Sequence, residues 1–195
     1  LEFRRVLFRS GFSFNSTSMH GSYTKYESNH NHRYRGGTLK FDEASFAATS
    51  RIPHVADLRF NTHYKKGKNE LGRNKNYNYD VNASREFGVW AKLQVGRNQS
   101  VYDTKFNQET VYDHNYYSKY TTDYAQLDIP IPHDLGKLTL GHDMIHYKTL
   151  NYKNNYNMMR FGYTFPTWHR LTPYVSWGFR YHGQGGNDFS TGLAY

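Results

Sequence analysis

Two histidines of this sequence stand at a spacing that metal sites use. His142 and His146 are four positions apart, which would place both imidazoles on one face of a helix, where they could bind zinc. The segment around them reads as a strand, in which four residues span about 13 Å, too far for one zinc ion with bonds of about 2 Å. The chain also has no cysteine, which excludes a thiolate zinc site and a disulfide scaffold. We therefore expect no metal site and no cofactor.

Acidic residues stand next to histidines at three places, and an Asp–His pair is a common part of hydrolytic sites. The pairs are Asp113 with His114, His133 with Asp134, and His142 with Asp143. Adjacent residues of a strand point to opposite faces, so adjacency alone builds no catalytic dyad. The sequence holds 11 histidines, and such neighbours therefore arise easily by chance. We expect the protein not to be an enzyme, with a hydrolase as the alternative.

The densest charge cluster is basic and lies in residues 65–76, a very polar stretch that we expect to be a long external loop. It contains Lys65, Lys66, Lys68, Arg73 and Lys75 against Glu70 alone. Such a cluster suits contact with anions, either phosphate groups at a membrane surface or an acidic solute steered to a pore mouth. The chain carries a formal net charge of +9, but its basic residues lie on no recognisable nucleic-acid-binding module, so no nucleic-acid partner is expected.

The segments that position these residues alternate between apolar and polar side chains. This period of two recurs along the chain without helical periodicity and predicts about ten strands, each with one apolar and one polar face, over residues 18–195. We expect the apolar faces to carry Leu58, Phe60, Leu93, Leu127, Phe161, Val175 and Phe179. We expect the opposite faces to carry Arg59, His63, Asp80, Lys92, Gln126, Asp128, Arg160, Arg180 and His182.

The alternation breaks within residues 33–49, near Asp42 and Glu43, and within residues 137–149, near Gly141 and His142. A β-bulge in each segment would restore it. Between the strands, short links alternate with longer polar links, as in an up-and-down meander with tight turns at one rim. The longer links include residues 65–76 and residues 104–115, and the shorter ones include residues 86–88 and residues 132–137.

Several long strands with an apolar face need a large partner surface, either a second sheet or lipid. Lipid is favoured because the strands reach the 9–11 residues that span a bilayer when tilted, and because the opposite faces carry charges that a sandwich core would reject. No run approaches eighteen apolar residues, so no transmembrane helix is expected. We therefore predict an all-β, up-and-down antiparallel transmembrane β-barrel. A soluble sandwich or a lipocalin-like barrel is the alternative.

The first ten residues, LEFRRVLFRS, match the translated end of a common sequencing-library adapter. We therefore assign residues 1–10 to an adapter-derived artefact and expect the true N-terminus to be missing. Residues 11–195 are expected to form a single β-barrel domain or part of one.

The pattern of residues 18–195 resembles that of Gram-negative outer-membrane β-barrel proteins, of the porin-like or the usher and secretion type. The segment FSTGLAY (residues 189–195) is similar to the closing strand of such barrels, and YAQLDIPIPHDLGKLTLG (residues 124–141) resembles the strand–turn–strand units of fimbrial ushers. The resemblance implies a location in the outer membrane, contact with lipid and lipopolysaccharide, and a lumen lined by the nine residues of the polar faces.

Three functions are compatible with such a barrel. The first is a channel that passes solutes or polymers, such as anionic oligosaccharides, through a lumen of mixed charge. The second is the barrel portion of a fimbrial usher or another secretion pore. The third is a closed ten-stranded barrel that acts through its external loops as an adhesin or a surface enzyme. Barrel size separates them, because eight strands fill with side chains whereas sixteen to eighteen leave a channel. The oligomeric state stays open.

Overall fold

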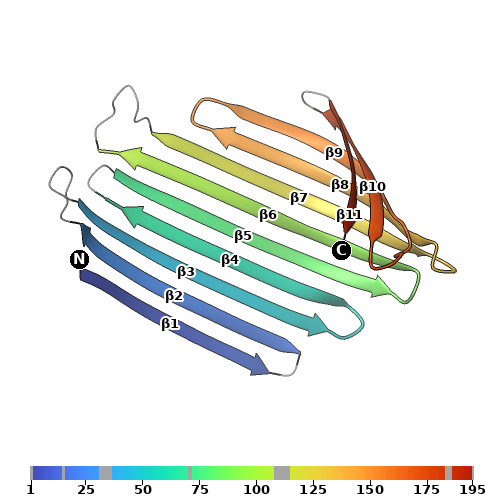
Figure 1. Cartoon of the computed structure of the whole chain (residues 1–195), viewed down its shortest axis with the longest axis horizontal. Coiled ribbons are helices and arrows are strands. Elements are labelled where there is room, and N and C mark those ends of the chain that lie inside the picture. The colour runs from blue at the N-terminus through green and yellow to red at the C-terminus, as the bar shows by residue number, and fades with distance from the viewer. Residues whose placement is uncertain are drawn as a thin grey trace.

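The chain folds into one antiparallel sheet of eleven strands, each paired only with its neighbours in the sequence (Figure 1). The computed structural model describes residues 2–14, 16–30, 37–69, 72–107, 115–182 and 186–194, and the statements below concern these ranges. The strands are β1 (Glu2–Phe14), β2 (Thr17–His30), β3 (Gly37–Ile52), β4 (Ala56–Lys68), β5 (Gly72–Phe87), β6 (Ala91–Phe106), β7 (Tyr116–Ile131), β8 (Gly136–Thr149), β9 (Lys153–Thr164), β10 (Thr172–His182) and β11 (Gly186–Ala194). Within these ranges no helix is long and apolar enough to cross a membrane.

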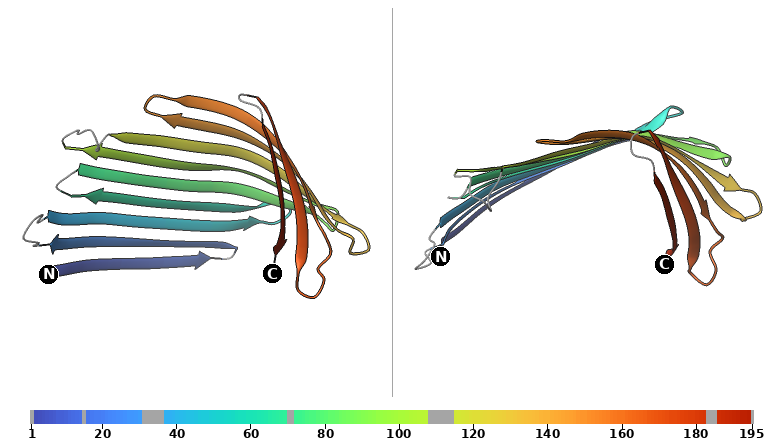
Figure 2. Two further views of the ribbon diagram at one scale, coloured as in Figure 1. Left: turned by 45° about the horizontal axis from the view of Figure 1, so that its top comes forward. Right: turned by 90° about the horizontal axis from the view of Figure 1, so that it is seen from above.

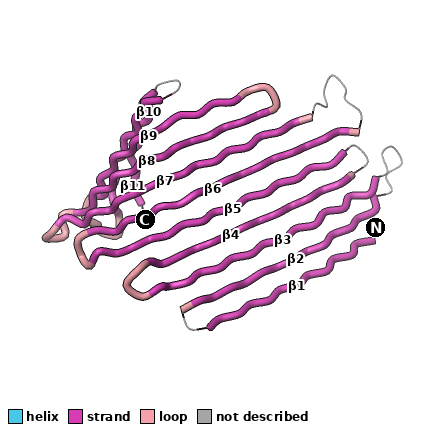
Figure 3. Tube along the Cα trace, turned by 180° about the vertical axis from the view of Figure 1, so that it is seen from behind, coloured by secondary structure: helices cyan, strands magenta, loops and turns pink. Residues whose placement is uncertain are grey.

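The sheet is bent into an arch. The strands from β1 to β9 lie side by side in a curved layer, and β10 and β11 turn sharply away from it (Figures 2 and 3). β1 and β11 form the two edges, and no pairing joins them in the described part of the chain. The predicted up-and-down antiparallel architecture is therefore confirmed, in the form of an open wall with a concave and a convex face.

The predicted number of strands is confirmed for β2 to β11, which supply ten strands over residues 17–194. β1 adds an eleventh strand from residues 2–14, most of which we assigned to the adapter-like stretch. It pairs with β2 without a break, from Phe14 opposite Thr17 to Glu2 opposite Asn29.

The two expected β-bulges are wrong. β3 and β8 pair with both neighbours in a continuous register, and the shift in register lies instead in β10, between Arg180 and His182. In β3 and β8 the side chains alternate between the two faces throughout. The apparent breaks are polar residues that lie on the convex face and are hydrogen-bonded there. Asp42 accepts a hydrogen bond from the Tyr23 hydroxyl at 3.1 Å, and Nε2 of His142 lies 2.6 Å from the Tyr181 hydroxyl.

The expected long loop over residues 65–76 is also wrong. β4 continues to Lys68 and β5 begins at Gly72, so the five basic residues of this stretch lie in strands. Polar side chains did not end the ladder, because strand pairing depends on backbone hydrogen bonds and not on an apolar face. The turn is closed by Asn69, whose Oδ1 accepts a hydrogen bond from the Gly72 amide at 2.9 Å. The links at the two rims therefore differ less in length than predicted.

The turn between β7 and β8 requires left-handed backbone. His133 and Asp134 have φ of 63° and 55°, and Gly136 follows them with φ of 112°. A Cβ added to Gly136 would run into the backbone carbonyl of Thr164 in β9, so a side chain there meets both strain and a fixed obstacle.

Replacing Gly136 with alanine is expected to lower the free energy of unfolding by about 2 kcal/mol, because a left-handed conformation costs a β-carbon about 1–2 kcal/mol and the clash adds to it. Urea unfolding of the protein in lipid vesicles measures this cost. Gly162→Ala is the control, since a Cβ there meets the side chain of Thr139 at an ordinary 3.5 Å. Equal costs for both variants would contradict the assignment of strain to Gly136.

Candidate functional site

The convex face carries the apolar residues predicted from the sequence. Strand register aligns Leu93 with Leu127, Leu127 with Leu140, and Leu140 with Phe161 on one face across four strands. The remaining predicted residues share this face through the same registers, and the full set is Leu58, Phe60, Leu93, Leu127, Phe161, Val175 and Phe179. The expected separation of an apolar from a polar face is therefore present across the sheet.

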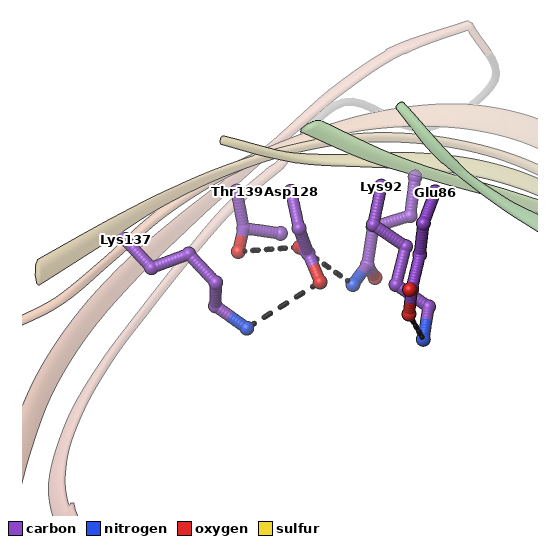
Figure 4. A network of polar contacts seen from close by, with 6 residues as sticks. Glu86, Lys92, Asp128, Lys137 and Thr139 are labelled. Carbon is purple, nitrogen blue, oxygen red and sulfur yellow. Dashed lines mark hydrogen bonds and ion pairs between the residues drawn. The ribbon is translucent and has the colours of Figure 1, made fainter. Parts of the chain in front are cut away.

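The opposite, concave face carries the predicted polar residues. Register places Arg59, His63, Asp80, Lys92, Gln126, Asp128, Arg160 and Arg180 on it. The backbone of His182 pairs with Asn157, but its side chain lies outside the described residues. Figure 4 shows the side chains of Glu86, Lys92, Asp128, Lys137 and Thr139 pointing into the hollow of the arch. That these residues line a pore stays a prediction.

Asp128 organises one polar network on the concave face (Figure 4). Its carboxylate accepts hydrogen bonds from Thr139 at 2.9 Å and from the Gln126 amide at 3.1 Å, and the ammonium of Lys137 lies 3.4 Å away. Because each carboxylate oxygen has a donor from a neighbouring strand or turn, the negative charge of Asp128 is compensated locally.

A second network joins Arg160 in β9 to Asp143 in β8. Nε of Arg160 lies 2.6 Å from one carboxylate oxygen, and a terminal nitrogen lies 2.9 Å from the other. Asp143 is only 5% exposed. Gly141 faces Arg160 across the strands and leaves room for its guanidinium, because a Cβ at that position would already lie 3.3 Å from it. The polar-face residues predicted from the sequence did not include Asp143, and the signal that could have found it is its parity with Lys137 and Thr139 along β8.

Other ion pairs on the concave face follow the same arrangement. Arg180 lies 2.9 Å from Asp188 and stacks over the ring of Tyr156 at 5.0 Å. Arg51 lies 3.3 Å from Asp57 and Lys92 lies 3.3 Å from Glu86, and Nε2 of His63 lies 3.7 Å from a carboxylate oxygen of Glu43. Cations and carboxylates therefore alternate in close pairs, and the face presents mixed charge without a large region of one sign.

Arg59 and Asp80 are charged residues of the concave face that belong to no ion pair in the described part of the chain. Within the described ranges, no carboxylate lies at salt-bridge distance from Arg59, and no cation lies at that distance from Asp80. Asp80 accepts a hydrogen bond from the Asn82 amide at 3.0 Å, which leaves its charge in place. Both groups therefore keep an uncompensated charge on the concave face.

The basic cluster of β4 and β5 is divided between the two faces. Lys65 lies on the concave face, with its ammonium 5.0 Å from the centre of the Phe41 ring. Lys66 opposite Lys75, and Lys68 opposite Arg73, lie on the convex face. Most of this cluster therefore points away from the hollow of the arch and not toward a pore mouth.

The histidines and acidic residues singled out in the sequence are not brought together. His142 and Asp143 lie on opposite faces of β8, and no group of three or more His, Cys, Asp or Glu side chains that could hold a metal ion occurs in the part of the chain that the structure describes. His133 and Asp134 lie in the tight turn after β7. Asp113 and His114 fall outside the described residues.

Comparison with known proteins identifies the fold. No protein-family model matches the chain, and no curated protein matches it in sequence. Among solved structures, the alcaligin outer-membrane receptor FauA from Bordetella pertussis superimposes with a TM-score of 0.66 at 16% identity, covering 98% of this chain and 40% of that one. The outer-membrane channel DcaP of Acinetobacter baumannii superimposes with a TM-score of 0.63 at 11% identity, covering 96% of this chain and 60% of that one.

The chain spans about half the length of these two structures, and identities this low establish the fold alone. Both are outer-membrane proteins of Gram-negative bacteria, which supports the location expected from the sequence. The wall of eleven antiparallel strands, apolar outside and charged inside, thus has the fold of the Gram-negative outer-membrane β-barrels.

Proposed function

We propose that this chain forms part of the wall of an outer-membrane channel, and that its concave face lines the path of a polar solute. The observation that carries the proposal is the polar concave face itself, which continues from β3 to β11 with side chains of both charges. In a bilayer the convex face meets lipid, and a charged face is retained only where it meets water or another polar surface.

The size of the wall supports an open lumen. Eight strands make a barrel just wide enough to be filled by its own side chains, and this sheet already has eleven without closing. Its two edges present unpaired backbone groups, which cost several kcal/mol each in hydrocarbon, so the edges require further strands or each other. A barrel larger than the described sheet would leave a channel.

A closed, plugged barrel is the second candidate, and strand direction supports it. β1 and β11 are both odd-numbered strands of an up-and-down sheet, so they run in the same direction, and joining them would make a parallel pair. β2 and β11 run in opposite directions and could close a barrel of ten antiparallel strands, the even number typical of bacterial barrels. Such a barrel would act through its external loops, as an adhesin or a surface enzyme.

Single-channel recording of the complete gene product in a planar bilayer tests the channel. Arg59→Gln is expected to shift selectivity toward cations, and Asp80→Asn is expected to shift it toward anions, because each removes one unpaired charge from the path. The reversal potential in a salt gradient measures both shifts. Arg85→Gln is the control, since Arg85 lies on the convex face opposite Leu93.

Absence of conductance from a correctly folded barrel would reject the channel in favour of the plugged barrel. A conductance large enough for polymers would instead favour a secretion pore. We propose a polar molecule as the solute, and an anionic oligosaccharide is one class of such molecules.

A further inference from the structure

A row of three lysines crosses the convex face near one rim. Lys119 of β7 is directly opposite Lys148 of β8, and Lys148 is directly opposite Lys153 of β9. No carboxylate lies at salt-bridge distance from any of the three within the described ranges. Like charges that face each other across strands destabilise a sheet, so this arrangement is unfavourable until an anion lies between them.

The lysines border a hollow of about 430 Å³ on the same face. Toward the middle of the strands the hollow ends at His146, whose Nδ1 lies 3.1 Å from Oδ1 of Asn155, and at Arg97. Arg97 is held by Asp123 through two contacts of 2.5 Å and 2.8 Å, so its charge is already compensated. The uncompensated positive charge of the hollow therefore belongs to the lysines.

The height of the hollow matches the headgroup region of a bilayer. Leu127 lies in the middle of the apolar band, and Lys119 stands eight residues away on the same strand, about 27 Å along it. With the usual strand tilt this is about 20 Å along the membrane normal, beyond the edge of an apolar band about 25 Å tall. The lysines thus lie just outside the hydrocarbon.

A second hollow, of about 570 Å³, adjoins the first on the same face and is apolar. Its lining includes Met19, Ala48, Leu58, Phe60, Ala83 and Val95. Arg97 lines both hollows, so the basic site and the apolar site border the same side chain. A ligand that fills both must carry a negatively charged head and a hydrocarbon chain.

We propose that this double hollow binds a phosphorylated glycolipid of the outer leaflet, with a phosphate between Lys119, Lys148 and Lys153 and an acyl chain in the apolar hollow. Charge complementarity selects the phosphate, and the neighbouring apolar surface selects a lipid over free phosphate. The site is on the lipid side of the wall, so it does not depend on whether the concave face conducts.

Isothermal titration calorimetry of the complete gene product in detergent micelles, with lipid A as the probe, tests the site. Lys119→Gln/Lys148→Gln/Lys153→Gln is expected to weaken binding about 100-fold, since each lysine near an anionic surface contributes about fivefold. Lys25→Gln/Lys66→Gln/Lys68→Gln removes three lysines from elsewhere on the convex face, and it is expected to change binding less than threefold. The triple arginine variant at the proposed site is expected to retain binding.

Heat-dependent mobility on gels confirms that each variant is folded before titration. Equal losses in the two triple glutamine variants would overturn the proposal in favour of a diffuse charge effect. Inorganic phosphate that binds as tightly as lipid A would overturn the lipid as the ligand. Both results can be obtained from a protein that shows no conductance, so failure of this site and failure of the channel are separate outcomes.

Discussion

Replacing Arg160 with methionine is expected to lower the free energy of unfolding by about 3 kcal/mol, because it leaves the carboxylate of Asp143 buried without its cation. Asp143 is 5% exposed, and both of its carboxylate oxygens contact the guanidinium of Arg160, which is itself partly exposed to water. Because Arg160 is partly exposed, we expect the loss of stability to lie at the low end of the range for buried ion pairs. Guanidinium unfolding in lipid vesicles, followed by tryptophan fluorescence, measures it.

The double variant Arg160→Met/Asp143→Leu separates the pair from its parts. Removal of both charges is expected to recover most of the loss, since an apolar pair of similar volume replaces a buried ion pair at little cost. Arg180→Met is the matched control, because its partner Asp188 has a side chain that is 58% exposed, and exposed pairs contribute about 1 kcal/mol or less. If Arg160→Met cost no more than Arg180→Met, burial of Asp143 would not be what matters.

Leu127→Arg is expected to destabilise the barrel in a bilayer by about 2–4 kcal/mol, the cost of an arginine on the lipid face at the midplane. Leu127 lies in the central row of the apolar band, between Leu93 and Leu140. The same change at the next residue, Gln126→Arg, is expected to cost far less. The Gln126 side chain points to the concave face and already donates to Asp128 at 3.1 Å, which an arginine would also reach.

Urea titration of both variants in vesicles gives the comparison, and the difference between adjacent positions is the informative quantity. Equal penalties at positions 126 and 127 would mean that both faces of the sheet meet the same environment. That outcome would reject the bilayer on the convex side and favour a second packed sheet there.

The face of the sheet on which each side chain lies was predictable from the sequence, because apolar and polar residues alternate along each strand. Leu58 and Arg59, or Leu93 and Lys92, differ by one position and lie on opposite faces as predicted. The ends of the strands were not predictable. Lys65 to Lys68 read as loop, but the backbone ladder continues wherever two chains run together, whether or not their side chains are apolar.

The partners on the concave face were also beyond the sequence. Arg160 was identified as a concave-face residue, but its pairing with Asp143 depends on the register of β8 against β9, which the turn at residues 150–152 sets. The supposed irregularity at His142 arose because a histidine seemed unsuited to a lipid face. The hydroxyl of Tyr181, from a strand 39 residues away in sequence, supplies the hydrogen bond that makes it compatible.

Each strand of this sheet pairs only with the strands before and after it in the sequence, which affects how the sheet can change in evolution. Because no strand crosses over another, a whole hairpin can be gained or lost by duplication or deletion without disturbing any other pair. A single strand cannot, since its loss would reverse the direction of every later strand and move every later link to the opposite rim. Relatives of this chain are therefore expected to differ in circumference by steps of two strands, and to keep their alternation in phase on both sides of each insertion.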